Sequence, residues 1–207
     1  MTFSAKDLCS RSCMQIKFFN EHPELRPKPN INTEIGTTFQ EDVAKSTKGV
    51  IGQEMRGTYC NGGLFINFAN DIVCQDKIIE VKSVRDKPED WYFNASVLQC
   101  SFYKAMIMSG ANRLRTATFF ANLGNEEKEC TVSSNIDYYL SFGEDKYLIE
   151  VKDRNAIVKF FCDKANACLD WTAARQFDFQ YKHLEYQTLK EYFSYAKIEN
   201  INQREGY

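Results

Sequence analysis

Apolar and polar residues alternate in two stretches of the chain, which is the pattern of half-buried β-strands. The first stretch comprises the runs Leu64–Cys74 and Lys77–Val84, both rich in β-branched and aromatic residues, and Gln75-Asp76 between them is typical of a tight turn. The second comprises residues 136–142 and 146–151, which are separated by a short turn that contains glycine. The pattern therefore predicts two β-hairpins.

Helical spacing marks three further stretches. Residues 33–47, 95–109 and most of 157–198 carry apolar residues at intervals of three and four, which favours amphipathic helices. Residues 115–122 predict one more buried strand, and residues 200–207 are expected to fray. The predicted order of helix, hairpin, helix, strand, hairpin and helices is that of a mixed α/β domain.

Prolines separate the beginning of the chain from this domain. Three of the four prolines lie between residues 23 and 29, and each disfavours a helical conformation in the residue before it. We therefore expect residues 1–32 to form an N-terminal arm with a short helix at 5–20, and residues 33–207 to form a single domain. A length of 207 residues fits one domain with an extension.

Composition and charge exclude several classes of protein. Lys and Arg number 26 against 28 Asp and Glu, so the net charge is −2, which excludes histone-like binding of nucleic acid through a large positive charge. A nuclease with a local basic groove and an acidic metal site remains compatible. No apolar run approaches the roughly 18 residues that span a membrane, and Met1–Ser12 lack the apolar core of a secretory signal. We expect a cytoplasmic protein without a membrane partner, whose eight cysteines are free thiols.

The first predicted hairpin carries a set of residues with recognisable chemistry. Side chains alternate along a strand, so Glu80 and Lys82 point to the same face, and the turn folds Asp71 back beside Glu80. Carboxylate oxygens are the ligands that Mg²⁺ prefers. A lysine next to them can position the attacking water and offset phosphate charge. This set therefore predicts metal-assisted hydrolysis of phosphodiester bonds.

The same tripeptide occurs a second time, as Glu150-Val151-Lys152 with Asp137 upstream. Charged pairs of this kind are common on exposed strands, so the tripeptide alone has little specificity. Only the first copy is followed by Gln99 and Tyr103, which are four residues apart on a predicted helix. We therefore favour the first copy as the site, and the second copy is the alternative.

The order Asp, Glu-x-Lys, Gln-x-x-x-Tyr over residues 71–103 resembles the PD-(D/E)xK nuclease superfamily, in particular its RecB-like branch, which includes the CRISPR-adaptation exonucleases. The resemblance covers about residues 36–120. It implies a restriction-endonuclease-like α/β core, with a mixed central sheet flanked by helices. The second hairpin and the C-terminal helices would be additions to that core.

The resemblance also implies roles for the residues of the first hairpin. Asp71 and Glu80 would be catalytic residues and metal ligands, and the backbone carbonyl of Val81 would be a further ligand. The cofactor would be Mg²⁺ or Mn²⁺. Lys82 would be the catalytic lysine.

Two helices complete the implied site. Gln99 and Tyr103 would line the groove and contact DNA. In relatives, the first helix supplies an acidic residue or a histidine about four positions after a glycine; here Gly36 places Gln40 at that position and Glu41 one residue later. Because Gln40 carries no charge, we favour Glu41 as the additional catalytic and metal-binding residue, and Gln40 is the alternative.

Many RecB-like enzymes also hold an iron–sulfur cluster with one cysteine before the nuclease core and three after it. Cys9 or Cys13 precedes the core here, and Cys162 and Cys168 follow it. A lysine occupies the position of the third later cysteine, and Cys130 would have to replace it. We therefore expect no iron–sulfur cluster.

Taken together, these expectations favour a metal-dependent deoxyribonuclease that acts as an exonuclease or on DNA ends and branched DNA. The resemblance implies a helicase or recombination partner. One alternative is a catalytically inactive protein of the same fold that binds nucleic acid or a protein, because the first-helix position holds the uncharged Gln40 and the sequence has no strong basic patch. Another is an RNA endonuclease, because the metal chemistry does not distinguish the two sugars.

Overall fold

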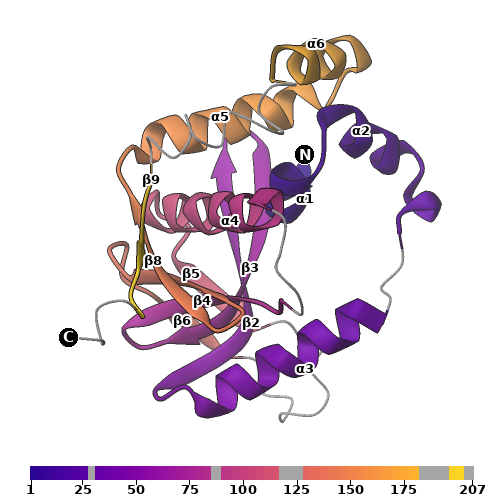
Figure 1. The fold of residues 1–207 in the computed structure, drawn as a ribbon. Coiled ribbons are helices and arrows are strands. Elements are labelled where there is room, and N and C mark those ends of the chain that lie inside the picture. The colour runs from indigo at the N-terminus through magenta and orange to yellow at the C-terminus, as the bar shows by residue number, and fades with distance from the viewer. Residues whose placement is uncertain (28–30, 85–89, 117–127, 182–195, 203–207) are drawn as a thin grey trace.

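A computed structural model describes residues 1–27, 31–84, 90–116, 128–181 and 196–202 of the chain (Figure 1). These residues form an α/β fold, in which helices pack on both faces of one mixed, largely antiparallel sheet. The strands are β1 (Thr2–Ser4), β2 (Val50–Asn61), β3 (Leu64–Cys74), β4 (Lys77–Lys82), β5 (Arg113–Thr116), β6 (Glu129–Thr131), β7 (Asp137–Phe142), β8 (Asp145–Val151) and β9 (Ala196–Asn200). The helices are α1 (Ala5–Ser10), α2 (Cys13–Glu21), α3 (Ile31–Ser46), α4 (Asp90–Met108), α5 (Arg154–Ala167) and α6 (Trp171–Tyr181), with a short 3-10 helix at Pro23–Leu25.

The strand order of the sheet is β6-β5-β2-β3-β4-β7-β8-β9. Strand β1 pairs in parallel with the beginning of β3, and β4 pairs in parallel with β7. The other pairs are antiparallel. The two predicted hairpins, β3–β4 and β7–β8, are confirmed, and the β4–β7 pairing joins them into one sheet.

Strand β2 was not among the predicted elements; it runs through a stretch with several glycines and pairs with β3. Two expectations for local structure are wrong. The single helix expected at 5–20 is two helices, since the Ser12 side chain caps α2 in a capping box with Gln15. Residues 196–198 were expected to be helical but lie in β9, which pairs with β8. Of the strand expected at 115–122, residues 117–122 lie outside the described residues.

The segment expected to be an arm packs against the domain over most of its length. Phe3, Leu8 and Ile16 are buried in the same core cluster as the sheet and α4. The far end of the chain holds this segment in place, because the carboxylate of Asp178 in α6 accepts hydrogen bonds from the first backbone N–H groups of α2. A carboxylate at this position satisfies unpaired donors and favours the helix dipole.

Two core clusters lie on opposite faces of the sheet. The larger cluster packs the sheet against α1, α2, α4, α5 and α6, and the smaller one packs β3 and β4 against α3. Strand β4 contributes to both, because Ile78 belongs to the larger cluster whereas Ile79 and Val81 belong to the smaller. Glu80 and Lys82 therefore face α4, as strand alternation predicts.

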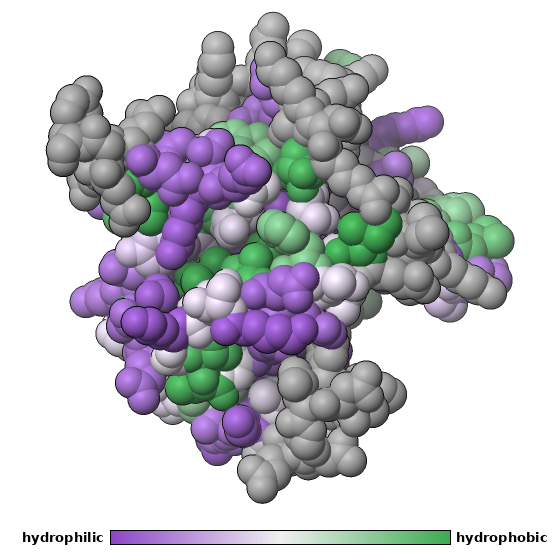
Figure 2. Space-filling model, turned by 60° about the horizontal axis from the view of Figure 1, so that its bottom comes forward, coloured by the Kyte–Doolittle hydropathy of each residue, from purple (hydrophilic) through white to green (hydrophobic). Residues whose placement is uncertain are grey.

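The surface near α3 is mixed in character. Figure 2 turns the bottom of Figure 1 toward the reader, and hydrophobic residues gather near the middle of this face with hydrophilic residues on either side. Among the residues that the structure describes, none of the helices is long and apolar enough to cross a membrane.

Candidate active site

The candidate site lies where β3 and β4 separate. The two strands pair at Ile72–Ile79 and Val73–Ile78. One residue further along, the side chain of Asp71 replaces the backbone as a partner, because its Oδ2 accepts a hydrogen bond of 2.7 Å from the N–H of Val81. This contact places the Asp71 carboxylate next to the strand segment that carries Glu80.

Glu80 is the most buried carboxylate of the site, with 1% of its surface exposed. Its Oε1 accepts hydrogen bonds from Lys82 Nζ at 2.5 Å and from Gln99 Nε2 at 2.6 Å. Its Oε2 is buried and has no hydrogen-bond partner among the residues that the structure describes. An ionised carboxylate accepts hydrogen bonds through both oxygens, and a buried acceptor without a partner is costly. The Oε2 atom thus lacks a proton donor or a cation.

Helix α4 orients this carboxylate. Gln99 and Tyr103 are one turn apart, and Gln99 Nε2 also donates to the Tyr103 hydroxyl at 3.2 Å. The Tyr103 ring packs against Phe68 of β3 with ring centroids 5.4 Å apart. Both α4 side chains line the pocket described below but are almost fully buried. Their present contacts position Glu80.

The charges of the site are strongly coupled. Burial raises the pKa of Asp71 well above its ordinary value, and the carboxylates of Glu80 and Glu54 raise it further. Burial alone would lower the pKa of Lys82, but the Glu80 and Asp71 carboxylates outweigh that effect and raise it. Lys82 is therefore an ammonium ion throughout the neutral range.

The first-helix residue at the site is Gln40. Its Nε2 donates to Glu54 Oε1 at 3.1 Å and to the backbone carbonyl of Asp71 at 3.2 Å. Glu41 points elsewhere, since it is not among the residues that line the pocket. Val81 likewise does not line the pocket, and its N–H is the donor to Asp71. The choice of Glu41 over Gln40 thus finds no support in the geometry.

Sequence reasoning missed Glu54. This residue lies in β2 opposite Asp71, between the pairs Gln53–Ile72 and Met55–Asn70. The sequence analysis did not predict the strand that carries Glu54. A single acidic residue next to Met55 was the one feature of the sequence that marked this position.

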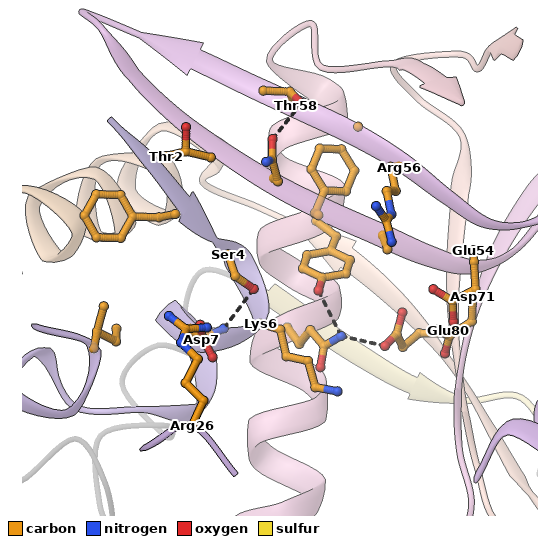
Figure 3. Close-up of a pocket in the computed structure, with 18 of the residues that line it drawn as sticks. Thr2, Ser4, Lys6, Asp7, Arg26, Glu54, Arg56, Thr58, Asp71 and Glu80 are labelled. Carbon is orange, nitrogen blue, oxygen red and sulfur yellow. Dashed lines mark hydrogen bonds and ion pairs between the residues drawn. The ribbon is translucent and has the colours of Figure 1, made fainter. Parts of the chain in front are cut away.

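A pocket of about 570 Å³ opens beside these side chains. Figure 3 shows Glu54, Asp71 and Glu80 at one side of it, with Lys6 from α1 facing them. Arg56 of β2 borders the same pocket next to the carboxylates. The pocket therefore combines clustered carboxylates with cationic side chains on its rim. Its full lining consists of Thr2, Phe3, Ser4, Lys6, Asp7, Ile16, Asn20, Arg26, Glu54, Arg56, Gly57, Thr58, Asn67, Phe68, Ala69, Asp71, Glu80, Lys82, Gln99 and Tyr103.

The second Glu-Val-Lys copy lies away from this pocket. Glu150 is half exposed and pairs with Lys197 of β9 at 3.8 Å. Neither Asp137 nor Lys152 lines the pocket. The geometry gives this copy the character of an exposed strand with a surface ion pair.

The cysteines at the positions considered for a cluster have other partners. Cys13 Sγ donates to the backbone carbonyl of Lys164 at 3.5 Å, and Cys162 Sγ accepts a hydrogen bond from Asn61 at 3.9 Å. Cys130 lies against Met55, sulfur to sulfur, at 3.8 Å.

The donor atoms of the pocket have the chemistry of a divalent-cation site. Within the described part of the chain, no three His, Cys, Asp or Glu side chains are arranged as a ready-made metal site. The pocket nevertheless presents carboxylate oxygens and is lined by no cysteine or histidine among the described residues, and one of these oxygens, Glu80 Oε2, is buried there without a partner. Oxygen ligands of this kind fit Mg²⁺ or Mn²⁺ and do not fit a soft metal.

Comparisons with known proteins give little further information. No model of a known protein family matches this chain, and no curated protein matches it. A solved structure described as the crystal structure of SSO0001 is similar over 79% of this chain and 75% of that one, with 19% sequence identity and a TM-score of 0.46. A TM-score this low does not establish a shared fold.

Proposed function

We propose that this protein is a nuclease with a restriction-endonuclease-like core, which uses Mg²⁺ or Mn²⁺ to hydrolyse phosphodiester bonds in DNA. The observation that carries the proposal is Glu80. Its buried Oε2 has no partner, and it lies beside Asp71 in a pocket that also presents Lys82. A purely structural carboxylate at 1% exposure would be expected to have both oxygens satisfied.

Each side chain has a role that its contacts support. Asp71 and Glu80 would hold the metal ion, which when bound lowers the pKa of water and neutralises phosphate charge. Gln99 keeps Glu80 in position through its 2.6 Å hydrogen bond. Lys82 is the electrostatic stabiliser of charge that develops on the phosphate, because an ammonium with a raised pKa does not act as a general base.

The cationic rim favours a polyanionic substrate. Lys6 and Arg56 border the pocket next to the carboxylates, and cations at this position would contact phosphates on either side of the scissile bond. The net charge of −2 is compatible with this arrangement, since the positive charge is local.

The test is a cleavage assay with Mn²⁺ on end-labelled and circular DNA, in single-stranded and duplex form, with RNA alongside. We expect cleavage of DNA, its loss in Asp71→Asn, and wild-type cleavage in the matched control Asp137→Asn from the second copy. Faster cleavage of RNA than of DNA would make RNA the substrate in place of DNA. Cleavage that survives Asp71→Asn would contradict the assignment.

A second candidate function is a catalytically inactive binding protein of the same fold. It is favoured by one observation, the uncharged Gln40 at the position where the first helix of relatives supplies a carboxylate or histidine. Isothermal titration with Mn²⁺ separates the two candidates, because the inactive protein would bind nucleic acid without binding the ion.

A further inference from the structure

Glu54 lies beside Asp71 and Glu80, the two carboxylates of the candidate site. It lies opposite Asp71 across the β2–β3 pair, and it lines the pocket together with Asp71 and Glu80. Figure 3 shows the three carboxylates gathered at the same side. Electrostatic coupling agrees with this placement, because Glu54 raises the pKa of Asp71 and Glu80 raises the pKa of Glu54.

The backbone at Glu54 is unusual. Its φ is +48°, and within the described residues it is the one residue other than glycine with a positive φ. This conformation costs on the order of 1 kcal/mol for a residue with a Cβ, and such strain persists where the surroundings hold the residue in place. The Glu54 carboxylate enters the pocket on the same side of β2 as Arg56 and Thr58, which lie two and four residues further along the strand.

Gln40 holds the Glu54 side chain. Its amide nitrogen donates to both Glu54 Oε1 and the backbone carbonyl of Asp71. Helix α3 therefore contributes an amide to the site, and β2 contributes the carboxylate. The resemblance implies a carboxylate on the first helix, where this chain has Gln40. The carboxylate of Glu54 lies next to that position, because Gln40 donates a hydrogen bond to it.

From these contacts we infer that Glu54 is the third carboxylate ligand of the metal ion, and that Gln40 is the residue that positions it. The inference rests on the proposed nuclease function. The buried, unpartnered Oε2 of Glu80 is the independent sign that a cation belongs among these side chains. Three neighbouring carboxylates repel one another, and a bound cation would offset that repulsion.

The alternative ligand is Glu41. It lies next to Gln40 on α3 but outside the pocket lining, which makes it a matched control. It has the same charge and side-chain length as Glu54 and differs in its position relative to the pocket.

The test is Mn²⁺ binding to the full chain, measured by isothermal titration or electron paramagnetic resonance without any nucleic acid. Loss of one ligand should raise the Kd for Mn²⁺ at least about 10-fold in Glu54→Gln, an isosteric change that can still accept the hydrogen bond from Gln40. Glu41→Gln should bind Mn²⁺ as the wild type does. Wild-type affinity in Glu54→Gln, together with lost affinity in Asp71→Asn, would overturn the inference and leave the proposed function standing. Absence of Mn²⁺ binding in the wild type would instead overturn the proposed function.

A second variant covers the case in which Glu54→Gln does not fold. Glu54→Asp keeps the charge and withdraws the carboxylate by one methylene. A ligand shortened in this way should raise the Kd for Mn²⁺ at least about threefold, on the scale of small changes in metal-site geometry. An unchanged Kd in folded Glu54→Asp would contradict the inference.

Discussion

At the scale of a single residue, the Lys82 ammonium group lies beside the Glu80 and Asp71 carboxylates, which raise its pKa. In the proposed nuclease it would also stabilise charge that develops on a phosphate. The side chain is 15% exposed and its partner Glu80 is 1% exposed, so the pair is shielded from water. A change at Lys82 should therefore affect both turnover and stability.

We expect Lys82→Ala to lower the single-turnover rate about 100-fold or more, the scale of removing one electrostatic stabiliser. It should lower the free energy of unfolding by about 3 kcal/mol, because Glu80 loses its counter-charge in a buried site. Mn²⁺ binding should change much less, since the carboxylates remain. Lys82→Arg should not restore the rate, because a planar guanidinium does not replace a compact ammonium. The exposed Lys152→Ala is the control, and a wild-type rate in Lys82→Ala would contradict a catalytic role.

The raised pKa of Asp71 predicts a pH-dependent stability difference in metal-free protein. The folded protein holds this proton more tightly than the unfolded chain, where the pKa is about 3.9. Wild-type stability therefore falls as pH rises from about 4 through the folded pKa. Asp71→Asn removes this loss and keeps an oxygen that can accept the hydrogen bond from Val81.

We therefore expect urea unfolding with EDTA to give nearly equal stabilities for the two proteins below about pH 4. At neutral pH Asp71→Asn should be the more stable. Addition of Mn²⁺ should reverse the order, because only the wild type keeps the full ligand set. A stability difference between the two proteins that does not change with pH would contradict a raised pKa of Asp71 in the folded protein.

Some of these residues could be predicted from sequence and others could not. Strand alternation places Glu80 and Lys82 on one face, and the turn after β3 brings Asp71 close, because both relations are local. Glu54 depends on the register between β2 and β3, which short-range patterns do not encode. The same holds for Gln40, because only the contact between α3 and the sheet distinguishes it from Glu41.

At the scale of secondary structure, β2 explains why its sequence was hard to interpret. Gly57 has no side chain, so it interrupts the alternation of apolar and polar residues that would otherwise indicate a strand. Packing nevertheless requires a glycine at this position. A Cβ at this position would lie on the Phe68 ring, and it would be 3.0 Å from Leu114 Cδ2. The two predicted hairpins were recognisable because their turns are tight and their strands alternate regularly. Strand β9 was not, because only its pairing with β8 makes it extended.

Two glycine substitutions test this reading with opposite expected signs. Gly57→Ala should lower the free energy of unfolding by about 1–3 kcal/mol, as for an overpacked core. Gly36→Ala in α3 should raise it by up to about 1 kcal/mol, because among the described residues its Cβ would meet only Ser83 Oγ at 3.7 Å, and alanine favours the helix. Thermal and urea unfolding measure both. A Gly57→Ala protein as stable as the wild type would mean that β2 and β5 separate readily.

At the scale of the whole molecule, the pocket is assembled from segments far apart in the chain. Lys6 comes from α1, Arg56 from β2, and the carboxylates from β2, β3 and β4. The N-terminal segment is thus one wall of the candidate site. A phosphate backbone that enters the pocket would pass between this wall and the sheet.

Lys6→Ala and Arg56→Ala should each weaken DNA binding. In a plot of the logarithm of affinity against the logarithm of salt concentration, the magnitude of the slope should fall by about one in each variant, because one phosphate contact is lost. Fluorescence anisotropy with a catalytically inactive Asp71→Asn background measures this without cleavage. Lys152→Ala, outside the pocket, should leave both affinity and salt dependence unchanged. Equal salt dependence in all variants would place the DNA elsewhere on the protein.

The pairing of β4 has a consequence for how the protein is made. The strand that carries Glu80 and Lys82 contacts β3 over a short length, but it pairs with β7 from Lys77–Asp137 to Lys82–Phe142. During synthesis on the ribosome, this edge therefore stays open until residue 142 has emerged. Open apolar strand edges invite association between chains, and pairings that bridge long sequence separations form slowly. Nascent chains stalled before β7 would thus expose the strand that carries Glu80 and Lys82, and we expect association between chains to be favoured during this interval.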